Sequence, residues 1–140
     1  MVQSCIAYVT RAYKFSAAHR LYSPALDEAA NRAMYGKCTN PEGHGHNYRV
    51  EVTVRGAIDP VTGMAADLGR LDGAVGELVV ARFDHRHLNR DPLFAGERVP
   101  TGENIARAVW DLLTPHLPEG SLDRVRIVET RDNVFEYAAS

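Results

Sequence analysis

Apolar and polar residues alternate along several stretches of the chain, which is the pattern of a half-buried β-strand. Within residues 46–56 every second position is apolar: Tyr48, Val50, Val52 and Val54. Side chains two residues apart on a strand lie on one face, so these four residues share a face that should be buried. The same alternation predicts strands at residues 5–19, 46–56, 122–130 and 134–137, and a brief additional strand at 64–66.

Two other stretches repeat apolar residues at helical spacing. Asp67 is the expected start of a helix that ends near residue 82, and its apolar face is Leu68, Leu71, Val75, Leu78 and Val79. A second helix follows Thr101, its N-cap candidate, with the apolar face Ile105, Val109, Leu112 and Leu113. A short helix over residues 28–35 is also expected, with Asp27 as its N-cap.

The order of the main elements is strand, strand, helix, helix, strand, strand. Helices grouped between two pairs of strands are typical of an antiparallel α+β fold rather than an alternating parallel one. One layer of helices covers only one face of such a four-stranded sheet. We expect the other face to carry histidines and apolar residues, and a partner subunit to bury it.

Composition and charge narrow the classes of function. A chain of 140 residues has the length of one domain, which we place at residues 1–140. The net charge of −2 gives no basic footprint for nucleic acid, and no apolar run is long enough to span a membrane. The two cysteines make no disulfide framework, and the first residues do not form a signal peptide. We therefore expect a cytoplasmic protein with reduced thiols, and neither nucleic acid nor a membrane as its partner.

Three histidines lie in phase with apolar faces at strand ends. His44 and His46 begin the run that continues through Tyr48, and His19 ends the alternating run that begins at Tyr13. Neighbouring strands lie about 4.8 Å apart, so imidazoles from two strand ends can reach one ion. Three nitrogen ligands with one open position are typical of catalytic zinc. A lone histidine here would more often be a core residue, whereas three in phase predict a zinc site.

Other polar groups are candidates for chemistry on less specific patterns. Cys38 is the best candidate nucleophile or base, but a free thiol with a pKa of about 8.5 needs a neighbouring imidazolium or metal. The adjacent Asp84 and His85 indicate an oriented base, with a solvated loop as the alternative. Glu129 either pairs with an arginine or accepts two hydrogen bonds from a guanidine-like edge. Glu103 lies in the first turn of the second predicted helix, where an interaction with the helix dipole is a simpler interpretation than a role in the site.

The motifs that carry these residues resemble the 6-pyruvoyl-tetrahydropterin synthase family. The matching segments occur in family order between residues 13 and 137: Phe15–Leu21, Tyr35–Tyr48, Asp59–Met64, Asp84-His85, Thr101–Asn104 and Glu129-Thr130. The resemblance implies the tunnelling fold, with a four-stranded antiparallel sheet and two helices on one side. It also implies a homohexamer, a dimer of barrel-forming trimers, with active sites between subunits.

The resemblance further implies a role for each candidate residue. The family's zinc ligands correspond to His19, His44 and His46. Its catalytic groups correspond to Cys38, Asp84 and His85, and its pterin-binding residues to Glu129, Thr101 and Glu103. Gly102 departs from the family pattern, because relatives often carry a hydroxyl residue there.

The implied reaction converts 7,8-dihydroneopterin triphosphate to 6-pyruvoyl-tetrahydropterin and triphosphate, with zinc and without nicotinamide; an assisting role for magnesium stays open. The sister enzyme of queuosine biosynthesis, 6-carboxy-tetrahydropterin synthase, is the main alternative. Its cysteine usually stands four residues before the first histidine of the pair, whereas Cys38 stands six before His44. A zinc-stabilised protein that binds a pterin or purine without catalysis is the non-enzyme alternative.

Overall fold

The computed structural model describes residues 5–96 and 98–139. Its sheet consists of β1 (Ile6–His19), β2 (His44–Ala57), β3 (Arg86–His87), β4 (Leu122–Thr130) and β5 (Asn133–Tyr137). Their order across the sheet is β3-β1-β2-β4-β5, and every pair is antiparallel except β3 with β1. The α+β class and the four predicted antiparallel strands are confirmed, and the two-residue β3 extends the sheet to five.

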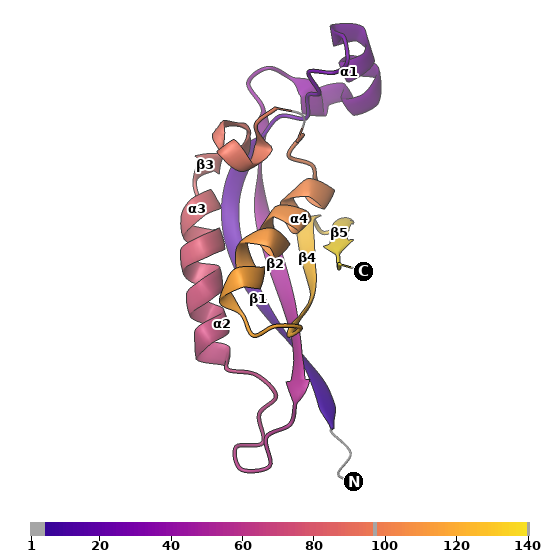
Figure 1. Cartoon of the computed structure of the whole chain (residues 1–140). Coiled ribbons are helices and arrows are strands. Elements are labelled where there is room, and N and C mark those ends of the chain that lie inside the picture. The colour runs from indigo at the N-terminus through magenta and orange to yellow at the C-terminus, as the bar shows by residue number, and fades with distance from the viewer. Residues whose placement is uncertain (1–4, 97, 140) are drawn as a thin grey trace.

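The pairing of the two longest strands sets the position of the histidines. The register places His19 opposite His44 and Ala17 opposite His46. All three histidines therefore lie at one end of the β1–β2 pair. Figure 1 shows that the short helix α1 (Glu28–Tyr35) lies beyond this end of the sheet.

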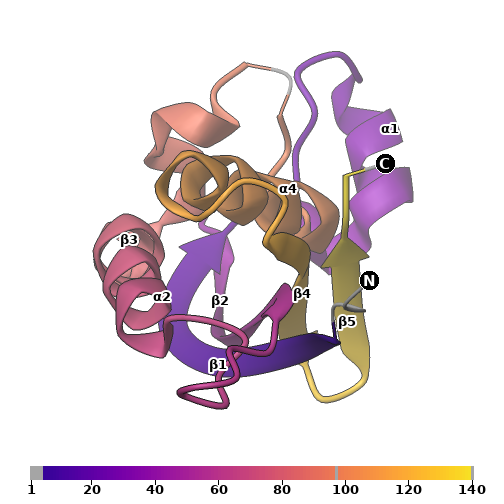
Figure 2. The same ribbon diagram turned by 60° about the horizontal axis from the view of Figure 1, so that its bottom comes forward.

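Two longer helical segments cover one face of the sheet. The first runs through α2 (Leu68–Val75), the π-helical turn η2 (Gly76–Val80) and α3 (Ala81–Phe83), and the second is α4 (Gly102–Leu113). Asp67 and Thr101 cap α2 and α4, because their side-chain oxygens accept backbone hydrogen bonds from Arg70 and Asn104. Figures 1 and 2 show α4 running across β4, with α2 beside it. Both predicted helices are confirmed.

The core lies between these helices and the sheet. The sheet contributes Phe15, Tyr48, Val50, Val52, Val125 and Ile127, and the helices contribute Leu71, Val75, Val79, Phe83, Ile105 and Val109. The opposite face of the sheet is largely polar, and Arg49 and Arg126 both bind Glu51 there. The expectation that the uncovered face carries histidines is therefore wrong, whereas a few apolar side chains, such as Tyr8 and Val134, are exposed there. The period of two puts the histidines in phase with Phe15 and Tyr48, on the covered face.

Two short segments differ from the prediction. Residues 64–66 form no strand, because the Met64 carbonyl accepts a hydrogen bond from Asp59 N and closes a turn instead. The polar stretch after Phe83, for which the sequence predicted no strand, contains β3, which pairs with the end of β1. Single turns of 3₁₀ helix complete the chain: η1 (Gly36–Thr39), η3 (Leu88–Arg90), η4 (Pro92–Phe94) and η5 (Thr114–His116). Among the described residues, no helix has the length and apolarity needed to cross a bilayer.

Candidate metal centre

The three predicted ligands converge at the ends of β1 and β2. Their ligand nitrogens all lie within 4.8 Å of one another, and Nε2 of His19 is 3.1 Å from Nε2 of His44. Ring centroids are 4.7 to 5.1 Å apart. Among the described residues, no carboxylate or thiol joins this group. Three imidazoles with no fourth protein ligand form the donor set of an open metal site.

His19 is oriented by a residue far away in the sequence. The ring is fully buried, and its Nδ1 lies 2.7 Å from the Pro100 carbonyl. A carbonyl only accepts hydrogen bonds, so Nδ1 carries the proton and the lone pair of Nε2 is free. The pKa of His19 is lowered to about 4, mainly by burial; the Pro100 hydrogen bond opposes this shift, and the neighbouring His44 and His46 add to it. The ring is therefore neutral near pH 7, as a metal ligand must be.

Of the other two histidines, His46 lacks a hydrogen-bond partner within the described part of the chain, whereas His44 contacts only the ring of His19 through its Nε2. Nε2 of His46 is buried and has no hydrogen-bond partner among the described residues. Oε1 of Glu129 lies 3.3 Å from it, but the two groups do not have the geometry of a hydrogen bond. Burial lowers the pKa of His44, and so does the neighbouring His46. A metal ion fits this arrangement, because the three ligand nitrogens converge and an ion would give the buried Nε2 of His46 the partner that it lacks.

Glu129 lies beside the cluster and not in an arginine pair. Its side chain is 13% exposed, and its inward position on β4 brings it to His46. Arg126, an arginine on the same strand, binds Glu51 on the other face instead. Tyr48 also lies close, with its ring centroid 5.5 Å from that of His46. Burial raises the pKa of its hydroxyl, and the nearby Glu129 carboxylate raises it further. A half-buried carboxylate with free lone pairs thus stands next to the three imidazoles.

The segment before α4 touches the cluster through its backbone. Pro100 holds His19, whereas the Thr101 hydroxyl accepts from Asn104 N as an N-cap and Glu103 is exposed. The exposed position of Glu103 in the first turn fits the interaction with the helix dipole. Gly102 has a packing reason: a Cβ there would lie 1.9 Å from the Phe135 ring.

The Cys38 turn is fixed to the end of β1. Leu21 N donates to the Cys38 carbonyl over 2.8 Å, and Nε of Arg20 donates to the Thr39 carbonyl over 2.7 Å. Both anchoring residues directly follow His19, so the half-buried thiol stands at the histidine end of the sheet. Among the described residues, no hydrogen bond joins Cys38 to His85.

The Asp84–His85 pair lies at the edge of the sheet. Nδ1 of His85 is 2.9 Å from Oδ2 of Asp84, and Ser16 N donates to Oδ1 of Asp84 over 2.9 Å. The Ser16 N–H and then His85 hold the pKa of Asp84 below its usual value. His85 adopts a left-handed conformation with φ 59°, and its side chain is 84% exposed. The carboxylate orients an imidazole that faces solvent in the single chain.

Nearly the whole chain matches a family of known proteins. The family model described as 6-pyruvoyl tetrahydropterin synthase matches residues 8–140. The chain belongs to this family. The 6-pyruvoyl tetrahydrobiopterin synthase of Homo sapiens is 45% identical over 95% of the chain and 92% of its own length. The structure of Caenorhabditis elegans 6-pyruvoyl tetrahydropterin synthase covers 100% of both chains with a TM-score of 0.94 at 40% identity.

The sister activity is also represented among similar proteins. A putative 6-carboxy-5,6,7,8-tetrahydropterin synthase of Archaeoglobus fulgidus is 38% identical over 66% of this chain and 73% of its own length. The archaeal protein therefore aligns with only about two thirds of this chain, whereas the human synthase aligns with almost all of it.

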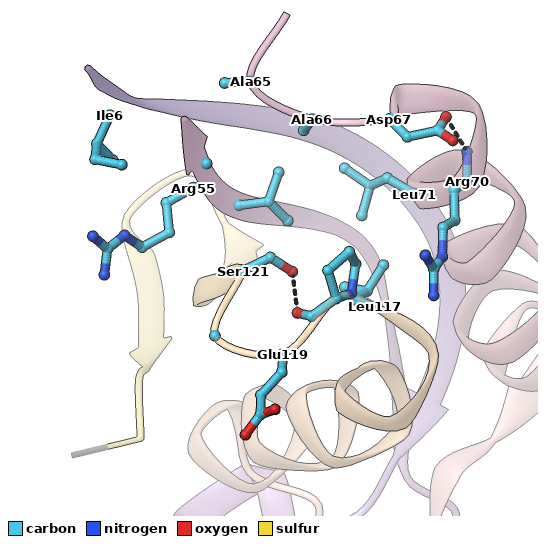
Figure 3. Close-up of a pocket in the computed structure, with 14 residues that line it drawn as sticks. Ile6, Arg55, Ala65, Ala66, Asp67, Arg70, Leu71, Leu117, Glu119 and Ser121 are labelled. Carbon is cyan, nitrogen blue, oxygen red and sulfur yellow. Dashed lines mark hydrogen bonds between the residues drawn. The ribbon is translucent and has the colours of Figure 1, made fainter. Parts of the chain in front are cut away.

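A cavity of about 370 Å³ lies at the other end of the sheet in this member of the 6-pyruvoyl tetrahydropterin synthase family. Figure 3 shows that it lies between the start of β1, the start of α2 and the turn before β4, with Arg55, Arg70 and Glu119 around it. None of the predicted site residues lines it. The chemistry of the predicted residues is therefore concentrated at the histidine end.

Three groups near that end were missed by sequence reasoning. The Pro100 carbonyl and the Tyr48 hydroxyl, 3.2 Å from Nδ1 of His19, surround the buried imidazole. His87, which the sequence analysis did not single out, is half-buried, and its Nδ1 has no partner among the described residues. The alternation marked Tyr48 as inward, but no local signal in the sequence pointed to Pro100 or His87.

Proposed function

We propose that this chain is a zinc-dependent 6-pyruvoyl-tetrahydropterin synthase, converting 7,8-dihydroneopterin triphosphate to 6-pyruvoyl-tetrahydropterin and triphosphate. The observation that carries the proposal is the cluster of three imidazoles with Glu129 beside it. Family membership and the names of its relatives support the same activity. The oxidation and reduction are internal to the substrate, so the reaction needs no nicotinamide.

His19, His44 and His46 would hold the metal. Three imidazole nitrogens favour zinc, whereas magnesium prefers oxygen ligands, so an assisting magnesium would bind elsewhere. When bound, the zinc supplies Lewis-acid polarisation of hydroxyl groups on the substrate side chain. The Pro100 carbonyl contributes by fixing the His19 tautomer.

Glu129 would anchor the pterin ring. Its carboxylate can accept two hydrogen bonds from the N2/N3 edge of the ring, as it would from arginine. Because Glu129 lies 3.3 Å from His46, a ring held there places its side chain at the histidines. Thr101 and Glu103 would complete the pocket, since Pro100 joins their segment to His19.

Cys38 would act as the base that removes a proton from a side-chain carbon and returns it to the substrate, with His85 stabilising the thiolate and Asp84 orienting His85. Because no hydrogen bond joins Cys38 to His85 among the described residues, we propose that they meet across a subunit boundary. Open sheet edges support such an assembly: no described strand pairs with the outer side of β5, and β3 covers only Ala17 and Ala18 of β1.

The experiment that tests this function is incubation of the zinc-loaded protein with 7,8-dihydroneopterin triphosphate, with products identified by mass spectrometry. We expect 6-pyruvoyl-tetrahydropterin and inorganic triphosphate. Formation of the 6-carboxy product would instead support the queuosine-pathway activity. Tight binding without any product would support the zinc-stabilised pterin-binding alternative. The spacing of six residues between Cys38 and His44 favours the first outcome.

A further inference from the structure

A depression lined by basic side chains lies next to the strand ends that carry the metal ligands. It has a volume of about 520 Å³, and its walls are residues 16–18 of β1, residues 45–47 of β2 and the segment containing β3. A depression of about 400 Å³ shares four of its residues: His85, Arg86, His87 and Arg90. We call the surface formed by these four residues the basic trough.

The basic trough is fixed in position by backbone contacts. Arg86 pairs with Ala17 and His87 with Ala18, the two residues that precede His19. The Asn89 side chain donates to the Arg20 carbonyl over 2.8 Å and accepts from Arg20 N over 2.7 Å. The segment is therefore attached to the strand end on both sides of His19. These contacts within one chain fix the position of the trough relative to the histidine cluster.

Two charges in the trough are not compensated by the described part of the chain. Arg86 and Arg90 form no hydrogen bond or ion pair with any described residue, unlike several other arginines. Arg82, on the wall of the smaller depression, donates two hydrogen bonds to Asp91 at 2.9 and 2.8 Å. Asp84 is likewise engaged by the backbone of β1. The nearby carboxylates thus leave two guanidinium groups available for a ligand.

His87 is a second, independent sign of a missing partner. Its Nδ1 is buried and has no hydrogen-bond partner among the described residues. Burial lowers the pKa of His87 and the positive charge of Arg90 lowers it further, which indicates that this guanidinium lies close to the ring. Buried ring nitrogens without partners are uncommon in proteins and often mark a bound group.

We propose that the basic trough binds the triphosphate of the substrate, with Arg86 and Arg90 as its main ligands. The proposal rests on the proposed function, which supplies a substrate with a pterin at one end and a triphosphate at the other. Guanidinium groups bind phosphate oxygens through paired, charge-assisted hydrogen bonds.

The order of the strands supports this assignment. The sheet runs β3-β1-β2-β4, so it passes from the trough to His19, then to His44 and His46, and then to Glu129. A pterin anchored by Glu129 would have its side chain at the histidines and its phosphates beyond them. Arg20, the other nearby arginine, is already engaged, because it binds the Thr39 carbonyl and stacks 4.4 Å from the Tyr22 ring.

Calorimetric titration of the zinc-loaded protein with inorganic triphosphate tests the trough directly. The double variant Arg86→Gln/Arg90→Gln is compared with wild type and with Arg107→Gln, a matched control whose exposed guanidinium lies on α4. We expect the double variant to bind triphosphate at least about tenfold more weakly and to raise KM for the substrate at least about tenfold. The control should stay within about twofold of wild type. The affinity for 7,8-dihydroneopterin, which lacks the triphosphate, should not change.

Unchanged triphosphate affinity in the double variant would overturn the proposal, as would no triphosphate binding by wild type. An equal loss of affinity for dihydroneopterin and triphosphate would also overturn it, because the arginines would then be structural. The lysine variants Arg86→Lys/Arg90→Lys should recover part of the binding, since the charge is kept. Arginine-dependent triphosphate binding without pyruvoyl product would leave the trough intact and contradict only the proposed function.

Discussion

At the scale of single residues, the Pro100 carbonyl decides which nitrogen of His19 can bind a metal. The carbonyl fixes the proton on Nδ1, and Nε2 then faces His44 at 3.1 Å. With a pKa lowered to about 4, the ring is neutral at any pH where the protein would work. Orientation by a hydrogen bond at the second ring nitrogen is the usual way in which proteins fix metal-binding histidines.

Replacing Cys38 separates catalysis from metal binding. The thiol is not among the candidate ligands, so Cys38→Ala should keep its zinc and its fold. Loss of a general base typically costs about 10²- to 10⁴-fold in rate, and we expect turnover to fall by at least about 10². Steady-state kinetics and metal analysis on the same sample measure both effects. Near wild-type turnover would show that the thiol is not the base.

Gly102 is required by the packing of Phe135 rather than by its flexibility. A Cβ at this position would lie 1.9 Å from the ring, so Gly102→Ala should lower the free energy of unfolding by about 1–3 kcal/mol despite alanine's better helix propensity. The control Gly73→Ala, on α2 with nothing within 4 Å, should raise it by about 0.5–1 kcal/mol. Urea denaturation measures both. Equal stabilisation by the two substitutions would refute the packing argument.

At the scale of elements, the sequence predicted the strands and helices whose apolar residues repeat with a clear period. Alternation gave the long strands, and the N-caps Asp67 and Thr101 marked the starts of α2 and α4. Alternation did not predict β3, because this strand lies in a polar stretch and forms through backbone pairing with β1, its one partner strand in the part of the chain that the structure describes. The histidine cluster was predictable for the same reason as the strands: its members share the phase of the core. The Pro100 contact was not, since it joins residues 81 positions apart.

The ion pair between Arg82 of α3 and Asp91, the residue before η4, should make part of the free energy of unfolding depend on pH. Hydrogen bonds from Arg82 lower the pKa of Asp91 below its ordinary value of about 3.9. A lowered carboxyl pKa stabilises the fold above pH 4, and this contribution is lost as the pH falls through the folded value. Arg82→Gln should therefore cost about 1 kcal/mol at pH 7, a modest amount because Arg82 is partly exposed.

Urea midpoints for wild type and Arg82→Gln between pH 7 and pH 2 would follow this contribution. The two curves should converge as the pH falls below the lowered pKa of Asp91, where the carboxyl group is protonated in both folded proteins. Arg107→Gln, which has no ion pair among the described residues, serves as the control. A stability difference of the same size at pH 2 and pH 7 would contradict the assignment to the Arg82–Asp91 pair.

At the scale of the whole molecule, one chain holds the proposed metal ligands and the proposed pterin anchor, but no hydrogen bond among its described residues joins Cys38 to His85. We therefore expect light scattering to give about six times the chain mass of 15.5 kDa. Mixing inactive Cys38→Ala with inactive His85→Ala subunits, after dissociation and reassembly, should restore part of the activity. Only sites that combine residues of two chains can be restored in this way. No recovery from properly assembled mixtures would place both residues in one chain's site.

Metal content per chain tests the central claim most directly. After reconstitution with zinc and removal of excess metal, mass spectrometry should find one zinc per chain in wild type. Far less zinc should remain in His19→Ala, His44→Ala or His46→Ala, each of which removes one imidazole from the cluster. The control His116→Ala, an exposed histidine far from the cluster in sequence, should keep its zinc. Wild type without bound zinc, or the three variants with undiminished zinc, would contradict the account.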